Sequence, residues 1–104
     1  MYGTVARLRV KRGQEEALKA LNAQWLRERQ PGTTGFVADY ILESERVPGE
    51  WFVLAIFDSE DSYRQNAADP RQHTEYEQLR TLLEADPEWN DGEIFAIEPA
   101  SVPV

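Results

Sequence analysis

His73 is the only histidine among the 104 residues, and it is the natural candidate for acid–base chemistry. The ordinary pKa of imidazole lies close to neutral pH, so this side chain can both accept and donate a proton under physiological conditions. The residues on either side of it, within 71–75, are all polar, which is equally typical of the solvated first turn of a helix. The sequence leaves a site role and a surface role for His73 open.

Asn66 and Tyr63 are candidates for the same site. Asn66 falls near the end of a short predicted helix, where its amide could bind an oxygen atom of a substrate. Asparagine is also common at helix ends for purely structural reasons. Tyr63 lies one turn earlier and could donate a phenolic hydrogen bond. Asn66, His73 and Tyr63 are therefore the predicted catalytic residues.

A pocket for these groups is predicted from aromatic residues combined with small ones. Aromatic side chains supply large apolar walls, whereas short side chains on a strand leave space above the sheet. The opposite interpretation is a solid core, in which the aromatic rings fill that space. The predicted lining comprises the aromatic residues Trp25, Phe57, Tyr63 and Tyr76 and the small residues Thr4, Ala6 and Ala55.

The composition argues against several kinds of site and partner. There is no cysteine, which excludes a disulfide, a thiolate metal site and a cysteine nucleophile. With one histidine, a zinc or iron site would need almost only carboxylate ligands, so we expect no metal. The net charge of −8 disfavours contact with nucleic-acid phosphates. No apolar run reaches the roughly 20 residues of a membrane span, and the first residues lack a signal-peptide pattern. We expect a cytoplasmic protein.

Hydrophobic periodicity predicts the elements that would position these residues. The predicted elements are strands at 2–10, 36–43, 51–57 and 93–97 and helices at 14–29, 59–67 and 69–86. Ser59 and Asp69 are typical N-terminal helix caps. The acidic loop at 88–92 holds Trp89, for which a place at the pocket mouth and a place against a second subunit are both open.

The element order β-α-β-β-α-β is that of a ferredoxin-like α+β fold with a four-stranded antiparallel sheet. We expect one domain over residues 1–98 and an irregular tail at 99–104. Residues 47–50, Val-Pro-Gly-Glu, are typical of a type II turn, so the second and third strands should form a hairpin. On the second strand, the residues expected to share one face are Phe36, Ala38, Tyr40 and Leu42.

The third predicted strand is apolar on both of its faces. Phe52, Leu54 and Ile56 point to one side, and the other residues of 51–57 point to the opposite side. Both helices of this fold cover the same face of the sheet, so one of the two sets would form an exposed apolar patch. A second copy of the chain is the simplest cover. Phe52, Leu54 and Ile56 are therefore the predicted homodimer interface.

Several short segments resemble the antibiotic biosynthesis monooxygenase (ABM) domain family. They are Val5-Ala6-Arg7-Leu8-Arg9-Val10-Lys11 with Gly13, Pro31-Gly32 with Gly35-Phe36, Phe57 with Ser59, Tyr63 with Asn66, and Asp69-Pro70. Their order and spacing carry the resemblance, which covers residues 1 to about 98. It implies a dimeric α+β barrel of two ferredoxin-like subunits packed sheet to sheet. Each subunit would hold a small pocket between its sheet and its helices.

The resemblance also implies a function. The expected activity is that of a cofactor-independent monooxygenase acting on a small aromatic or polyketide-like substrate, without metal or flavin. Haem-degrading members typically combine a strand asparagine, a tryptophan and a helical histidine. Here Thr4 and Ala6 offer no such asparagine and Phe57 replaces the tryptophan, so haem is not expected. The alternative is a non-catalytic dimeric domain that binds a small ligand or is associated with stress.

Overall fold

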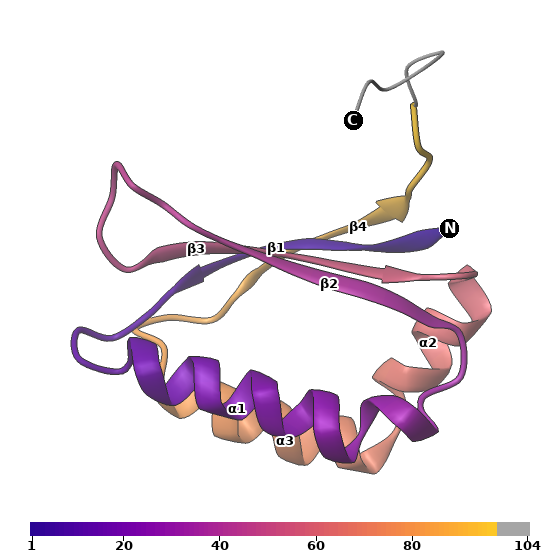
Figure 1. Cartoon of the computed structure of the whole chain (residues 1–104), viewed down its shortest axis with the longest axis horizontal. Coiled ribbons are helices and arrows are strands. Elements are labelled where there is room, and N and C mark those ends of the chain that lie inside the picture. Colours follow the sequence, from indigo (N-terminus) through magenta and orange to yellow (C-terminus); the bar gives the residue numbers. More distant parts are fainter. Residues whose placement is uncertain (98–104) are drawn as a thin grey trace, which may run out of the picture.

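The strand β1 (Tyr2–Arg9) lies inside a four-stranded antiparallel sheet, between β3 (Glu50–Phe57) and β4 (Glu88–Glu93). The other edge is β2 (Phe36–Glu43), so the strand order is β2-β3-β1-β4 (Figure 1). The computed structural model describes residues 1–97, and the predicted tail at 99–104 lies outside them. The predicted ferredoxin-like α+β fold is confirmed.

Three helices and one short turn connect the strands. They are α1 (Glu15–Glu28), η1 (Gln30–Gly32), α2 (Glu60–Ala67) and α3 (Pro70–Thr81). Figure 1 shows α1 and α3 beneath one face of the sheet and α2 near one end of it. No helix within residues 1–97 is long and apolar enough to cross a membrane.

The helix-facing side of the sheet carries the core. Along β1, the even-numbered residues from Thr4 to Leu8 are buried, which confirms the predicted period of two. Leu8 and Trp51 are cross-strand neighbours, and they pack with Leu18 of α1 and with Leu83, which follows α3. This core anchors α1 and the end of α3 at one end of the sheet.

Predicted turn and cap residues fix the ends of the elements. Gly49 has a φ of +83°, and the N–H of Glu50 donates to the carbonyl oxygen of Val47 at 3.1 Å, as the predicted turn requires. The Ser59 hydroxyl accepts a hydrogen bond from the N–H of Ser62, and the Asp69 carboxylate accepts one from the N–H of Arg71. These caps determine where α2 and α3 begin.

A β-bulge corrects the prediction for β2. Phe36 pairs with Phe57, whereas Ala38 pairs with Ile56, so two residues of β2 stand opposite one step of β3. The bulge turns Phe36 toward the helices, whereas Ala38 lies on the opposite face of the sheet. A strict period of two had predicted that Phe36 shares a face with Ala38, Tyr40 and Leu42. That prediction is wrong for Phe36.

The last strand also differs from the prediction. β4 spans Glu88–Glu93, not 93–97, and it includes the whole segment 88–92 that was expected to be an acidic loop. Side-chain contacts with β1 support its register: Arg7 forms an ion pair with Glu88 at 2.8 Å, and the amide of Asn90 donates to the carbonyl oxygen of Val5. The residues that pair with β4 belong to β1, which is far away in the sequence. The local apolar pattern at 93–97 could therefore not reveal where the last strand lies. Phe95 and Ile97 are 77% and 87% exposed.

The face of the sheet opposite the helices carries an open apolar patch in the single chain, beside the ion pairs of Arg7 with Glu50 and Glu88 on the same face. Register places Phe52, Leu54 and Ile56 on it, next to Leu42, Tyr40 and Ala38 of β2. Tyr40 and Leu42 are 63% and 59% exposed, whereas Ile56 is already buried in the single chain, at 9%. The predicted interface residues thus lie on the face that none of the described helices covers.

Candidate functional site

A cavity of about 580 Å3 lies between the helix-facing side of the sheet and the three helices. Its lining includes Thr4 of β1 and Ala55 of β3, which are cross-strand neighbours. Both side chains are short and leave open the space that longer residues would fill. Sites for small molecules usually have volumes of roughly 300–1,000 Å3. The cavity therefore has the size of a ligand site.

A row of aromatic rings borders this cavity. The ring centroids of Trp25 and Phe36 are 5.0 Å apart, those of Phe36 and Phe57 are 5.8 Å apart, and those of Phe57 and Tyr63 are 5.6 Å apart. All three pairs meet edge to face, an arrangement that the ring quadrupoles favour. The rings support one another and form a rigid wall. Phe36 was missed at the sequence level because the bulge that turns it inward has no clear local signal.

Tyr76 and Trp89 border the cavity from α3 and β4. Their ring centroids are 6.3 Å apart, and Trp89 remains half-exposed. Trp89 therefore lies at the edge of the cavity and packs on Tyr76. Ala6 was also predicted to line the pocket, but it lies outside the lining and belongs to the buried core with Leu8 and Trp51.

The hydroxyl of Tyr63 is engaged by a carboxylate. It donates a 2.8 Å hydrogen bond to Oδ1 of Asp91. The other carboxylate oxygen of Asp91, Oδ2, lies 3.3 Å from Nη1 of Arg64. Burial, followed by this hydrogen bond, raises the pKa of Tyr63 to about 12. Tyr63 is therefore protonated at neutral pH, and it can act as a hydrogen-bond donor but not as a base.

His73 borders the cavity, but its imidazole is directed elsewhere. Its Nε2 lies 2.7 Å from Oε1 of Glu77, one turn further along α3, and the side chain is 73% exposed. The surface interpretation of His73 thus fits its position better than an acid–base role inside the cavity.

Asn66 also lines the cavity, but its amide oxygen already has a partner. Nη2 of Arg29 donates a 2.6 Å hydrogen bond to Oδ1 of Asn66. The amide nitrogen of Asn66 makes a longer contact, 3.5 Å, with Gln72 of α3. Asn66 therefore holds an arginine side chain in place rather than offering a free oxygen to a ligand.

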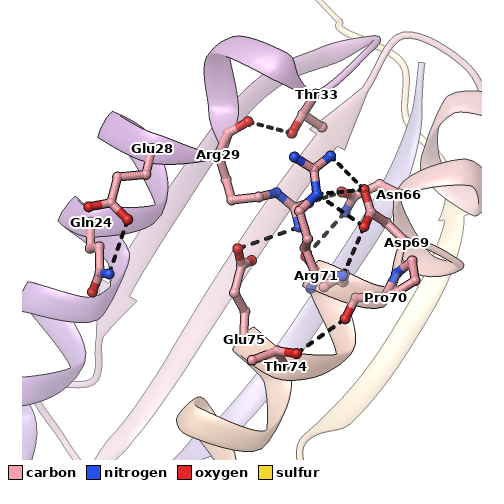
Figure 2. Close-up of polar contacts among 11 residues, drawn as sticks. Gln24, Glu28, Arg29, Thr33, Asn66, Asp69, Pro70, Arg71, Thr74 and Glu75 are labelled. Carbon is pink, nitrogen blue, oxygen red and sulfur yellow. Dashed lines mark hydrogen bonds and ion pairs between the residues drawn. The ribbon is translucent and has the colours of Figure 1, made fainter.

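Arg29 is the buried cation of this site. It directly follows α1, its side chain is only 7% exposed, and its Nη1 lies 3.4 Å from Oε1 of Glu75 (Figure 2). Within residues 1–97, Nε and Nη1 of Arg29 and Oε2 of Glu75 are buried without a hydrogen-bond partner. Burial raises the pKa of Glu75, although the nearby guanidinium acts to lower it. An arginine at a helix end is usually a solvated residue, so no sequence pattern signals this burial.

Asp39 is the half-buried acid of the site. It lies on the helix-facing side of β2, opposite Ala55, and lines the cavity. Its Oδ1 is buried without a hydrogen-bond partner in the described part of the chain. Burial alone raises the pKa of Asp39 to about 6. One sequence signal could have found it: Asp39 occupies the inward-facing phase of a strand on which an apolar residue is usual.

The family model of antibiotic biosynthesis monooxygenases matches residues 1–79, about three quarters of the sequence. The chain belongs to this family. The predicted resemblance to the ABM domain is thereby confirmed. No curated protein matches the sequence.

Several solved structures share the ABM fold with this chain. SnoaB from Streptomyces nogalater, a cofactor-independent oxygenase solved in a mutant form, has a TM-score of 0.76 and 22% identity over 94% of this chain and 96% of that one. A Deinococcus radiodurans protein that carries the same family name has a TM-score of 0.77 and 16% identity, covering 97% and 99%. A conserved protein from Methanosarcina mazei Go1 has a TM-score of 0.76 and 18% identity, covering 88% and 89%. At these identities the similarity establishes the fold.

Proposed function

We propose that this chain is a cofactor-independent monooxygenase of the ABM type, which oxidises a small aromatic or polyketide-like substrate in the cavity between sheet and helices. The observation that carries the proposal is the cavity itself, about 580 Å3 in volume and bordered by the rings of Trp25, Phe36, Phe57 and Tyr63. An apolar cavity with a few polar groups is the usual form of a site for small aromatic molecules.

The proposed reaction requires no bound redox group. An activated methylene of the substrate becomes a carbonyl, one oxygen atom of O2 enters the product, and the other leaves as water. All four electrons that O2 accepts come from the substrate. The protein needs to exclude water and to help remove a proton, because the anion of such a substrate gives up electrons more readily than its neutral form.

Oxygen uptake with anthrone, a tricyclic ketone with an activated methylene, tests this proposal. In buffer treated with a chelator and free of flavin, we expect the protein to raise oxygen consumption above the spontaneous rate and to form anthraquinone. A variant with the cavity narrowed, Ala55→Phe, should lose the effect. Consumption equal to that of buffer alone, with anthrone and with smaller phenols, would count against the enzyme.

A non-catalytic binding domain is the second candidate, and a specific observation favours it. The three predicted catalytic side chains are occupied or turned outward: Tyr63 bonds Asp91, Asn66 bonds Arg29, and His73 pairs with Glu77 at the surface. Binding of anthraquinone without any turnover of anthrone would favour this candidate over the monooxygenase.

We also propose that the chain functions as a homodimer. The support is the open apolar face, where Leu54 lies between Tyr40 of β2 and Val5 of β1. Apolar surface on three neighbouring strands is unfavourable in water, and a second copy packed sheet to sheet would remove it. In this arrangement the cavity, on the other face of the sheet, stays within each subunit.

A further inference from the structure

The carboxylate of Asp39 stands in an unusual environment for an acidic group. It is half-buried on the cavity wall, and its Oδ1 is buried with no hydrogen-bond partner within residues 1–97. Buried carboxylates are normally paired or hydrogen-bonded, because removing the charge from water without compensation is unfavourable. Burial accordingly raises the pKa of Asp39 to about 6, so the group binds a proton more readily than a solvated aspartate does.

The space beside Asp39 is open to a ligand. Its cross-strand neighbour on β3 is Ala55, and the neighbour of Ala55 on β1 is Thr4. All three residues line the same cavity. Because the two neighbours are short, a ligand lying on the sheet can approach the carboxylate, which a long side chain at either position would shield.

Arg29 supplies the opposite charge to the same cavity. Asn66 holds its Nη2 at 2.6 Å, which fixes the plane of the guanidinium (Figure 2). Glu75 lies 3.4 Å from Nη1, but neither Nη1 nor Nε forms a hydrogen bond with the described residues. Figure 2 also shows that the neighbouring arginine, Arg71, pairs with Asp69. The carboxylate of Asp69 is therefore already engaged. Arg29 thus retains buried N–H groups that can donate to an oxygen anion.

We propose that Asp39 and Arg29 ionise and hold an acidic aromatic ligand: the Asp39 carboxylate accepts a proton from an O–H or activated C–H of the ligand, and the Arg29 guanidinium binds the oxygen that becomes negative. The bond to hydrogen breaks, its electron pair stays on the ligand, and the proton forms an O–H bond on Asp39. The transfer moves negative charge from a carboxylate without a partner to an oxygen beside a cation, which favours it electrostatically. The ligand class is therefore a phenol or an enolisable ketone on an aromatic body.

The inference rests on the proposed function only for the later reaction with oxygen, because proton transfer needs nothing but the ligand and these two residues. In this arrangement Asn66 is a positioning residue, which acts through Arg29. This role differs from the direct contact with a ligand that its place near the end of α2 had suggested.

The test uses 2-hydroxyanthraquinone, which changes colour when it ionises and has no methylene to oxidise. At a pH where the free probe is neutral, the wild-type protein should bind it with the visible spectrum of the anion. Asp39→Asn should bind it in the neutral form, with the anion band lost, whereas Asp61→Asn, on the exposed side of α2, should behave as wild type. The matched probe 2-methoxyanthraquinone, which cannot ionise, should bind wild type and Asp39→Asn equally.

Arg29→Lys should weaken binding of the hydroxy probe about tenfold or more and leave that of the methoxy probe unchanged, with Arg46→Lys as the exposed control. If Arg29→Lys does not fold, Asn66→Ala should show the same selective loss. An anion band that persists in Asp39→Asn, equal affinity of wild type for both probes, or no binding of either would overturn the inference. Ionisation of the probe without oxygen uptake on anthrone would instead leave the inference standing and contradict the monooxygenase.

Discussion

Nη2 of Arg29 and Oδ1 of Asn66 lie 2.6 Å apart, and this hydrogen bond joins the end of α1 to the last turn of α2. It is the shortest of the contacts that hold the buried guanidinium, since the ion pair with Glu75 on α3 measures 3.4 Å. Three helices thus meet at one cation on the wall of the cavity. The geometry of the site and the packing of the helices depend on the same side chain.

Asn66→Ala should therefore destabilise the fold. The substitution leaves Nη2 of a buried cation without its partner, and such a loss typically lowers the free energy of unfolding by about 1–3 kcal/mol. Urea denaturation measures the change. Gln65→Ala, one residue earlier and exposed on the same helix, is the matched control and should be within about 0.5 kcal/mol of wild type. Equal effects of the two substitutions would contradict the anchoring role of Asn66.

Asp39 should make stability fall as pH rises. Because its pKa is raised from 3.8 to about 6 in the folded state, the folded form binds the proton more tightly than the unfolded chain does. Its contribution is fully present below pH 3.8 and is lost as pH rises through about 6, by up to about 3 kcal/mol. Asp39→Asn removes this contribution.

The measurement is the urea midpoint of wild type and Asp39→Asn between pH 4 and pH 8. The urea midpoint of Asp39→Asn should rise relative to that of wild type as pH rises. The midpoint of Asp61→Asn, a substitution at an exposed position, should change with pH in the same way as that of wild type. Parallel curves for Asp39→Asn would show that the carboxylate is solvated or paired.

Gly35→Ala should destabilise the turn that leads into β2. Gly35 has a φ of +78°, and an added Cβ would collide with the side chains of Asp58 and Ser62. We expect a loss of about 1–3 kcal/mol, measured by urea denaturation. Gly32→Ala is the control, because a Cβ there meets no atom within 4 Å and the φ is not positive. A Gly35→Ala protein as stable as the control would mean that the turn can rearrange.

Leu54→Lys should weaken or abolish the proposed dimer. The charge would lie in the middle of the open apolar face, where burial against a second copy without a partner is unfavourable. Light scattering at micromolar concentration should give two chain masses for wild type and one for the variant. Leu26→Lys, on the partly exposed surface of α1, should remain dimeric. A wild-type mass of one chain would refute the dimer.

The sequence predicted the fold because its signals are local and repeated. Period two in β1, the apolar run of β3 and the caps Ser59 and Asp69 each depend on residues close together in the chain. The bulge at Phe36 and the register of β4 depend on partners from other strands, such as the ion pair of Arg7 with Glu88, and no local pattern encodes them.

For the site, the chemical type of a residue predicted its role less well than its expected place on a strand or helix did. His73 was selected because imidazole titrates near neutrality, yet it lies on the surface. Thr4, Ala55 and the aromatic residues Trp25, Phe57, Tyr63 and Tyr76 do line the cavity. Arg29 was missed because charged residues are normally solvated, and only the folded chain reveals its burial. Asp39 was missed although it occupies the inward-facing phase of its strand.

The most direct test of the central claim is the source of the oxygen in the product. Anthrone incubated with wild-type protein under 18O2, with chelator and without flavin, should give anthraquinone that carries one 18O atom, at a rate above that in buffer. Asp39→Asn should form it more slowly, and Asp61→Asn at the wild-type rate. Product formed no faster than in buffer, or product whose new oxygen comes from water, would contradict a cofactor-independent monooxygenase.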